Sequence, residues 1–250
     1  MRESLRRIFV LTKRNGKEIL RDPLSLAFTI ALPLFMEILF YAIFHKATSQ
    51  FEMRYLAPGI VVFSQAFLTL FAGLLIAVDR GSAFLTRLYV SSARAYEFIF
   101  GYALSLLPLS LLQSILFFLV GGLLDPTLFS SRMIGAAFLA LVPSLFFLAT
   151  GILLGSLCNE RSIGGVASIL IAGQSLLSGM WYPIEGLGSG MLAVMNALPF
   201  RPATLLIQNA LNGVPDPFND FWKLLLIVLA YTLAAFAAAI LAFGDKMRAK

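Results

Sequence analysis

The sequence has little of what most protein chemistry requires. Cys158 is the single cysteine, which excludes an internal disulfide and a thiolate metal cluster. His45 is the single histidine, which excludes a histidine-rich metal site and a serine–histidine pair remote from it. No G-x-x-x-x-G-K-[ST] segment occurs, so we expect no ATP site of the P-loop kind on this chain. Ser189 in the run 186–190 lies among glycines that suit a turn, no base is near it, and no carboxylate pair suggests hydrolysis. We therefore expect a chain that is not an enzyme and that holds no cofactor or metal.

Charge is also scarce. Charged residues make up 13% of the 250 residues, whereas a soluble domain carries about 25%. Hydrophobic residues make up 59%, and the mean hydropathy is +0.88. This excess of apolar surface must face lipid, which predicts an integral membrane protein. The net charge of +6 does not indicate a nucleic-acid partner, because the cations mostly flank the apolar stretches.

Six stretches are long and apolar enough to cross a bilayer, which takes about 20 residues each. They are 24–44, 56–78, 98–120, 133–157, 165–182 and 221–243. No alternating strand pattern competes with them, so we predict an all-α, polytopic bundle that forms one domain over 1–250. Pro33, Pro108 and Pro143 fall near mid-span, where each removes one backbone hydrogen bond and is expected to kink its helix.

Lysine and arginine are distributed unevenly between the two sides of the predicted bundle. One side, which holds both termini, carries 14 of the 19 cations: Arg2, Arg6, Arg7, Lys13, Arg14, Lys17, Arg21, Arg80, Arg87, Arg94, Arg161, Lys246, Arg248 and Lys250. The other side carries Lys46, Arg54, Arg132, Arg201 and Lys223. The positive-inside rule therefore predicts a multi-pass protein with both termini in the cytoplasm.

Residues 1–22 have the pattern of an amphipathic helix on the inner membrane interface. Cations gather on one side of a helical projection, and Leu5, Ile8, Phe9, Leu11, Ile19 and Leu20 gather on the other. Such a helix places its basic face toward anionic headgroups. It serves either as an anchor alone or also as a docking surface for a cytoplasmic partner.

The loop at 79–97 is the longest predicted cytoplasmic connection. Phe84, Leu85, Leu88 and Tyr89 share one helical face, which suits insertion into a groove of a partner. The alternative is a solvated connector whose periodicity arises by chance.

The segment 183–212 is too polar to cross the membrane, and proline and glycine divide it into two helical pieces, roughly 188–198 and 202–212. Met191, Val194, Met195 and Leu198 share one face of the first piece. We predict an extracytoplasmic helical hairpin that dips into the outer leaflet or caps the bundle, with an ordinary surface loop as the alternative.

Polar residues within the spans are costly in hydrocarbon and therefore informative. The candidates for a substrate path are Glu37, Gln65, Gln113, Gln174 and Ser178, with the aromatic residues Phe63 and Phe67. These polar groups either make hydrogen bonds between helices or line a path for a substrate. The aromatic stripe serves either packing and lipid contact or the lining of such a path.

Three segments resemble the membrane subunit of ATP-binding cassette exporters, the type-two export permease class. "ILRDPLSLAFTIALPLF" is similar to the family's entry into span one, and "DRGSAFLTRLYVSSARAYEFIFG" resembles its coupling loop. "LSGMWYPIEGLGSGM" with "NALPFRPATLLIQNALNG" resembles its hairpin between spans five and six. The family usually has a proline where this chain has Ser91 and Ser92, and another where it has Gly188.

The resemblance implies an export permease that works as two copies in the cell (inner) membrane with a separate ATPase subunit, which would hold the ATP and magnesium. It implies ATPase-coupling contacts at Asp79, Arg80, Gly81, Phe84, Leu85, Arg87, Leu88 and Glu97, with Arg14 and Lys17 of the first helix. It also implies that Trp181, Tyr182, Pro183, Pro199 and Arg201 form a re-entrant outer hairpin that helps to shape the exit.

The cargo stays open between a small amphipathic compound, a lipid and a glycan. Two other classes remain for the chain itself. One is a passive channel or binding subunit without energy coupling. The other is an intramembrane protease, which the missing catalytic pair disfavours.

Overall fold

The described part of the computed structural model, residues 2–81, 94–213 and 221–248, is entirely helical and contains no strand. The elements, in chain order, are α1 (Arg2–Ile19), α2 (Pro23–Phe44), η1 (Ser49–Phe51), α3 (Met53–Gly81), α5 (Ala95–Leu124), η2 (Pro126–Leu128), α6 (Ser131–Leu139), α7 (Leu141–Leu157), α8 (Glu160–Leu177), α9 (Ser189–Ala197), α10 (Phe200–Asn212) and α11 (Lys223–Arg248). This confirms the predicted helical class.

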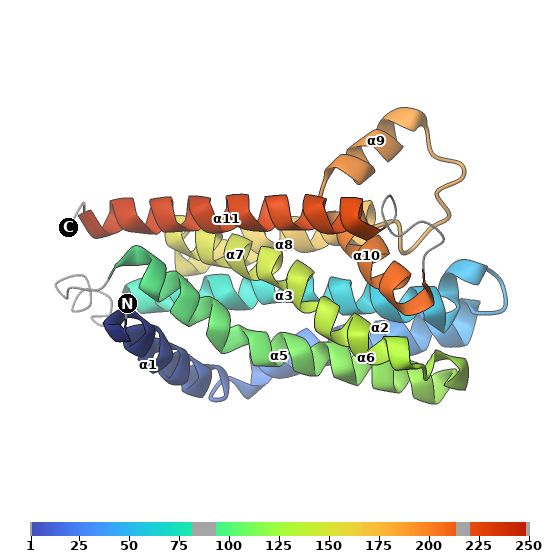
Figure 1. The fold of residues 1–250 in the computed structure, drawn as a ribbon, viewed down its shortest axis with the longest axis horizontal. Helices are drawn as coiled ribbons and strands as arrows, with labels where there is room; N and C mark the ends of the chain where they lie inside the picture. The colour runs from blue at the N-terminus through green and yellow to red at the C-terminus, as the bar shows by residue number, and fades with distance from the viewer. Residues whose placement is uncertain (1, 82–93, 214–220, 249–250) are drawn as a thin grey trace.

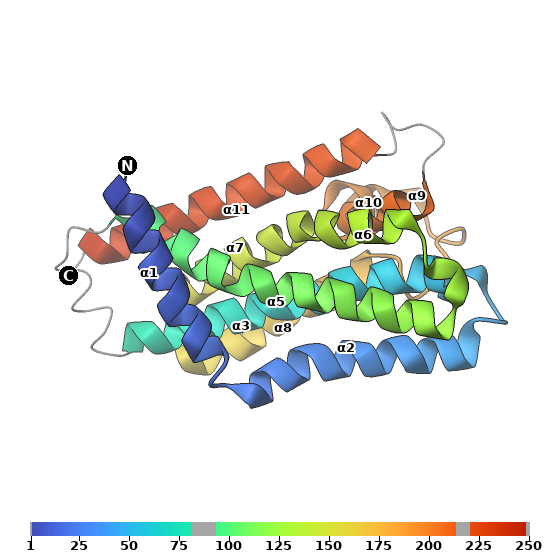
Figure 2. The ribbon, with the colours of Figure 1, turned by 60° about the horizontal axis from the view of Figure 1, so that its bottom comes forward.

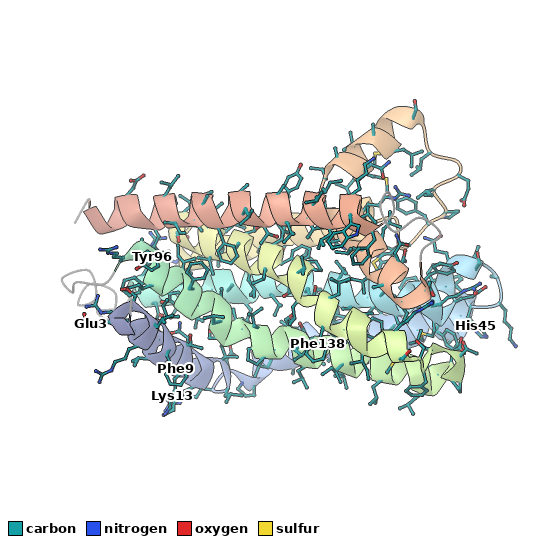
Figure 3. All side chains as sticks on the ribbon, viewed as in Figure 1. Glu3, Phe9, Lys13, His45, Tyr96 and Phe138 are labelled. Carbon is teal, nitrogen blue, oxygen red and sulfur yellow. The ribbon has the colours of Figure 1, made fainter. Side chains whose placement is uncertain are left out.

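The long helices run lengthwise in one bundle, and α1 crosses them at one end (Figures 1 and 2). The start of α1 and the end of α11 lie at that same end of the bundle. Figure 3 places Glu3 and Tyr96 at this end and His45 at the opposite end. We call the end that holds α1 the charged end, and the other the hairpin end.

Helix α3 forms the centre of the bundle. Of its most apolar stretch, 78% of the residues are buried, against 17% in α2 and 22% in α11. Two clusters of buried side chains follow one another along the bundle, one around Ile60 and Phe117 and the other around Leu68 and Tyr102. The outward faces of α2 and α11 carry large apolar side chains such as Phe28, which suits contact with lipid.

Five helical stretches are long and apolar enough to cross a membrane: Pro23–Phe44, Met53–Gly81, Ala95–Leu124, Ser131–Leu157 and Lys223–Asp245. The predicted fifth span, 165–182, corresponds to α8, which begins five residues earlier and ends at Leu177. Helix α8 lies beside the other long helices, but Glu160 and Arg161 in its first turn make it less apolar than they are. By length and composition alone, the described residues contain five candidate spans, or six if the bent pair α9 and α10 is counted as one.

The predicted fourth span is interrupted. Helix α6 ends at Leu139 and α7 begins at Leu141, and Pro143 stands in the first turn of α7. Because proline has no backbone N–H, the carbonyl of Leu139 loses its partner in the helix and the break falls there. Helices α2 and α5 continue through Pro33 and Pro108.

Close packing of α3 against α7 depends on two glycines of α7 that were not predicted from the sequence. A Cβ atom on Gly155 would lie 2.5 Å from the carbonyl oxygen of Gly73, and one on Gly151 would lie 2.4 Å from that of Thr69. Both obstacles are backbone atoms, which cannot move without separating the helices. The pair Gly151-x-x-x-Gly155 therefore sets the distance between the central helix and α7.

The hairpin prediction is close to the observed elements. Helices α9 and α10 meet at an angle of 76° across Leu198 and Pro199. Helix α10 is held to the start of α3, because Gln208 donates to the Tyr55 carbonyl at 2.9 Å and Asn212 donates to the Arg54 carbonyl at 2.9 Å.

The predicted apolar face of α9 is buried only in part. Met195 is fully buried, whereas Met191 and Val194 are 41% and 48% exposed. The chain itself covers only one side of this face, so whether the hairpin dips into the outer leaflet or caps the bundle stays a prediction. The 3.6-residue period identified an amphipathic helix but not how much of its apolar face the chain covers.

Candidate functional site at the charged end of the bundle

An arginine–aspartate pair joins α1 to the end of α3. The Arg14 guanidinium donates to both carboxylate oxygens of Asp79, at 2.5 Å and 2.7 Å. Tyr102 of α5 donates its hydroxyl to Asp79 Oδ2 at 2.5 Å. Asp79 is 4% exposed and Tyr102 is 1% exposed, so one buried carboxylate links three helices. Bidentate pairing of this kind fixes orientation as well as distance.

The electrostatics around Arg14 favour its charged form. Burial lowers the pKa of the Arg14 guanidinium, but the hydrogen bond and the charge of Asp79, together with Glu18 and Tyr102, outweigh burial and raise this pKa above the ordinary arginine value. Glu18, which accepts from Arg14 at 2.5 Å, has its pKa raised by burial and by repulsion from Asp79, against the opposing charges of Arg14 and Arg21. Arg14 thus serves two carboxylates that repel each other.

A second pair joins α1 to the start of α5. Glu97 is 1% exposed, and its Oε2 lies 3.5 Å from Arg7 Nη1. The same oxygen accepts from the backbone N–H of Arg94 at 3.0 Å, which caps the first turn of α5. Ser4 and Tyr96 are within hydrogen-bond distance at 3.1 Å.

The two pairs lie on either side of the segment 82–93. Arg7 and Arg14 are seven residues apart, so they project from one face of α1 about 10 Å from each other. Arg14 binds Asp79, just before the segment, and Arg7 binds Glu97, just after it. We call these two arginines, the two carboxylates and Tyr102 the stem network. It makes α1 and both stems of the loop a single connected unit.

The remaining predicted coupling residues fall into three groups. Phe84, Leu85, Arg87 and Leu88 lie outside the described residues. Arg80 donates to the carbonyls of Gly155, Ser156 and Cys158 at 2.8, 2.6 and 3.0 Å, so it satisfies the free carbonyls at the end of α7. Gly81 is the last residue of α3, and Lys17 is exposed on α1.

The face of α1 that meets the bundle differs from the predicted apolar face. Leu11 and Ile19 are 8% and 5% exposed and lie against the bundle, with Leu11 close to the Cα of Gly101. Leu5, Phe9 and Leu20 are 62%, 68% and 76% exposed. The predicted apolar side of this helix is therefore covered only in part by the chain, and its placement on the inner membrane interface stays a prediction. The helix carries one apolar stripe toward the protein and a second that stays uncovered.

The polar residues inside the bundle make hydrogen bonds between helices. Gln65 donates to Ser110 and Ser114 at 3.4 and 3.3 Å, and Gln113 donates to the Thr29 carbonyl at 3.1 Å. These bonds are what the first of the two alternatives expects. A role in a substrate path stays a prediction.

The other path candidates are also buried, except Phe67, which is partly buried. Gln174 donates to Thr204 at 3.2 Å, and Ser178 donates to the Ser175 carbonyl at 3.2 Å. Phe63 is buried, with its ring centroid 5.4 Å from that of Phe67. Gln174 thus joins α8 to α10, whereas the bond of Ser178 lies within the end of α8.

Glu37 of α2 differs from the other polar side chains in the bundle. It is completely buried, and neither of its carboxyl oxygens has a hydrogen-bond partner among the described residues. Its Oε1 atom faces Gly121 of α5, where a Cβ would lie 3.2 Å away.

At the hairpin end, Gln50 donates to the carbonyls of Gly179 and Tyr182 at 2.8 and 2.7 Å. Trp181 donates to Ser175 at 2.8 Å, and Arg201 donates to Asn196. Gln50 and Trp181 thus hold the turn that leads out of α8, where Gly179 has a φ of 72°, and Arg201 joins α10 to α9 within the hairpin.

Two prolines of the hairpin, Pro183 and Pro199, stand at breaks in the helices, as their missing N–H favours. Pro183 lies in the connection between α8 and α9, and Pro199 separates α9 from α10. A hollow of about 440 Å³ lies between the α8 turn and α10, lined in part by Tyr182, Pro183 and Arg201. The predicted hairpin residues are thus gathered at one end of the bundle.

Tyr102 and Asn15 were not identified from the sequence as functional candidates. Tyr102 stands about two turns into α5, and its hydroxyl meets Asp79 only because α3 and α5 run antiparallel in register. Asn15 is fully buried and accepts from Arg14 at 2.9 Å. The sequence offered only weak signals for them: Asn15 directly follows Arg14, and Tyr102 lies five residues after Glu97.

Comparison with known proteins agrees with this arrangement. Residues 6–212 match the family model described as ABC-2 type transporter. The chain is 34% identical over 147 residues to a protein of Cyanophora paradoxa named "Putative transport permease ycf38". That match covers 55% of this chain and 51% of the relative, so the chain spans about half the length of the curated relative it matches. The family match includes the whole stem network and the hairpin, and the chain belongs to the ABC-2 type transporter family, as a multi-pass transport permease of a membrane.

Proposed function

We propose that this chain is the membrane-spanning subunit of an ATP-binding cassette exporter and that a separate ATPase subunit docks on its charged end. The observation that carries the proposal is the stem network. Arg14–Asp79 and Arg7–Glu97 connect α1 to both helices that lead into the segment 82–93. A partner that pushes on this segment or on α1 therefore moves α3 and α5 together.

The energy source would be external to the chain. The sequence contains no P-loop, so ATP and magnesium would bind to the partner. Closure of two ATPase subunits would bias the bundle between inward and outward access, which requires only that the two states bind the partner differently. Both termini and the charged end would lie in the cytoplasm of the cell (inner) membrane, since that end carries most of the cations.

A second copy of the chain is proposed to cover the outward face of α8. Gly165, Ser168 and Ala172 are exposed there, and a Cβ on Gly164 or Gly165 would meet no atom within 4 Å. Small and polar side chains gain little from lipid but allow two helices to approach closely. Disulfide trapping of Ser168→Cys in a Cys158→Ser background should give a dimer, whereas Ala234→Cys on α11 should not.

The cargo would be a small amphipathic compound, a lipid or a glycan. Glu37 and the amide groups of Gln65 and Gln113 remain candidates for contact with it once the helices separate. A passive channel or binding subunit without energy coupling is the alternative function.

The deciding experiment is affinity purification of the full chain, followed by reconstitution and measurement of ATP hydrolysis and transport. We expect a bound ATPase whose hydrolysis the permease stimulates. Glu97→Gln and Arg87→Gln should reduce transport more than hydrolysis, whereas Glu52→Gln in the ion pair with Arg54 at the hairpin end should change neither. A purified chain that transports without any ATPase would establish the passive alternative instead.

A further inference from the structure

Two adjoining hollows lie beside α1 at the charged end. The first, of about 580 Å³, runs along the exposed side of α1 and is lined by Lys13, Lys17 and Arg21 among others. The second, of about 300 Å³, lies between the α1–α2 connection and α3. Glu18 and Arg21 line both, so the hollows meet at these two residues. Volumes of this size are typical of small-ligand sites.

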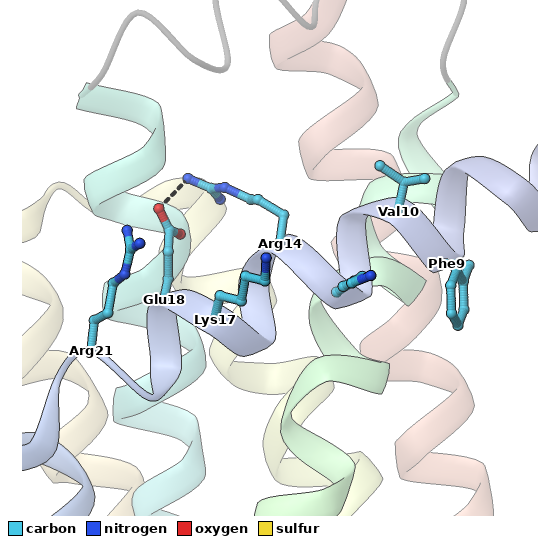
Figure 4. Close-up of a pocket in the computed structure, with 7 residues that line it drawn as sticks. Phe9, Val10, Arg14, Lys17, Glu18 and Arg21 are labelled. Atoms are coloured by element: carbon cyan, nitrogen blue, oxygen red, sulfur yellow. Dashed lines mark hydrogen bonds and ion pairs between the residues drawn. The ribbon is translucent and has the colours of Figure 1, made fainter.

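The first hollow is strongly cationic. Four basic side chains and one acid, Glu18, border it. Arg14 is engaged by Asp79 and Glu18, as Figure 4 shows for Glu18. Lys13, Lys17 and Arg21, in contrast, form no ion pair with any residue that the structure describes. Three available cations along one side of a helix are complementary to a phosphate group.

The second hollow is mainly apolar. Phe71, Leu74, Leu75 and Val78 of α3 line it. Its charged lining residues are Glu18 and Arg21, which it shares with the first hollow, and Asp22 and Asp79. From Phe71 to Val78 the helix advances about 10 Å away from the middle of the bundle. A molecule filling both hollows would place a charged group at the bundle end and a hydrocarbon chain along α3, toward the membrane interior.

The exposed side chains of α1 agree with a bound molecule whose charged group lies at the bundle end and whose hydrocarbon chain runs along α3. Phe9 points from α1 down the length of the bundle, whereas Val10 and Arg14 point to the opposite side (Figure 4). Leu5, Phe9 and Leu20 form the uncovered apolar stripe described above. A helix with such a stripe beside a basic one lies in the boundary between headgroups and acyl chains.

We propose that the two hollows form a binding site for one anionic phospholipid of the bilayer, with its phosphate at Lys17 and Arg21 and an acyl chain in the cleft against α3. The site lies next to Glu18, the partner of Arg14, so the bound lipid would steady α1 against the stem network. The proposal does not depend on an ATPase partner or on the identity of the cargo.

Calorimetric titration of the detergent-solubilised full chain tests the site with three probes. These are dioctanoyl phosphatidylglycerol, dioctanoyl phosphatidylcholine and glycerol 3-phosphate. We expect the anionic lipid to bind at least about five-fold more tightly than the zwitterionic lipid, and glycerol 3-phosphate not to bind at the same concentrations. Equal affinity for the two lipids would overturn the proposal, and binding of glycerol 3-phosphate as tight as that of the anionic lipid would reduce the site to a phosphate site.

Variants locate the binding. Each basic residue near an anionic lipid is worth about a factor of five, so Lys17→Gln with Arg21→Gln should weaken phosphatidylglycerol binding about 25-fold. Both side chains are exposed and make no ion pair with a described residue, so the double variant should fold. Lys46→Gln, which removes an exposed cation at the hairpin end, is the matched control and should bind as the parent does. An equal loss of affinity in the double variant and in Lys46→Gln would show that binding depends on the net charge of the protein and not on this site.

The apolar half has its own variant. Val78→Trp should fill the cleft from a position that is 48% exposed, and it should weaken both lipids equally while leaving the preference for the anionic one. Unchanged affinity in this variant would show that no acyl chain enters the cleft and would contradict the proposal.

Discussion

Removing one partner of the Arg14–Asp79 pair is predicted to destabilise the chain by an amount that depends on which partner is left behind. Loss of one member of a fully buried ion pair costs about 3–5 kcal/mol, because the other charge stays uncompensated. The Asp79 side chain is 5% exposed and the Arg14 side chain is 27% exposed. Water can solvate an orphaned Arg14 but not an orphaned Asp79.

We therefore expect Arg14→Gln to cost about 3 kcal/mol in the free energy of unfolding. Asp79→Asn should cost about 2 kcal/mol, since Glu18 and solvent still serve Arg14 and the amide oxygen still accepts from Tyr102. The double variant should cost less than the sum of the two, with a coupling of about 1–3 kcal/mol.

Unfolding of the full chain in mixed micelles, followed by circular dichroism across a denaturing-detergent titration, measures all four members of this cycle. Glu52→Gln is the control, because its pair with Arg54 at 2.7 Å is partly exposed on both sides and should contribute below about 1 kcal/mol. A coupling below about 0.5 kcal/mol, or a larger cost for Asp79→Asn than for Arg14→Gln, would refute the argument from burial.

Three further predictions follow from the described contacts. Gly155→Ala should destabilise the chain by about 1–3 kcal/mol, because its Cβ would meet the backbone of α3. Gly164→Ala is the control, since its Cβ faces open space and the variant should be neutral or slightly more stable. Equal unfolding midpoints for the two variants would contradict the close approach of α3 and α7. The raised pKa of Glu18 means that its stabilising contribution is present below the ordinary glutamate pKa and is lost as the pH rises through the raised value. Relative to Glu18→Gln, the parent should thus lose stability as the pH rises above the ordinary glutamate range, and a parallel pH profile of the two proteins would show no such contribution. Ser189→Cys in a Cys158→Ser background should react with a membrane-impermeant maleimide added outside intact cells, and reaction only after permeabilisation would reverse the proposed orientation.

Much of the architecture could be predicted because the bilayer constrains it tightly. Span length and apolar composition identified five of the six long stretches within a few residues, since each backbone polar group in hydrocarbon must be bonded within a helix. The error at α8 has a physical cause. Its polar first turn and its small residues make its composition ambiguous, so hydropathy alone placed it five residues too late.

The candidate site was harder to predict. Asp79, Glu97 and Arg14 stood out as membrane-flanking charges, but nothing in their spacing pairs Arg14 with Asp79 across 65 positions of sequence. Arg80, which the resemblance places among the coupling residues, also caps α7 through three carbonyls, because the end of that helix lies next to it.

The sequence by itself determined that the chain is a helical membrane protein, that a basic amphipathic helix precedes the first span, and that a broken hairpin lies before the last. These properties depend on local composition and on the 3.6-residue period, which are written in consecutive residues. Only the tertiary structure decided that Leu11 and Ile19 turn inward while Phe9 stays uncovered, and that one carboxylate, Asp79, holds three helices together. Lipid and protein interior are equally apolar, so an apolar face does not reveal which of the two it meets, and a charge does not reveal its partner until the helices are packed.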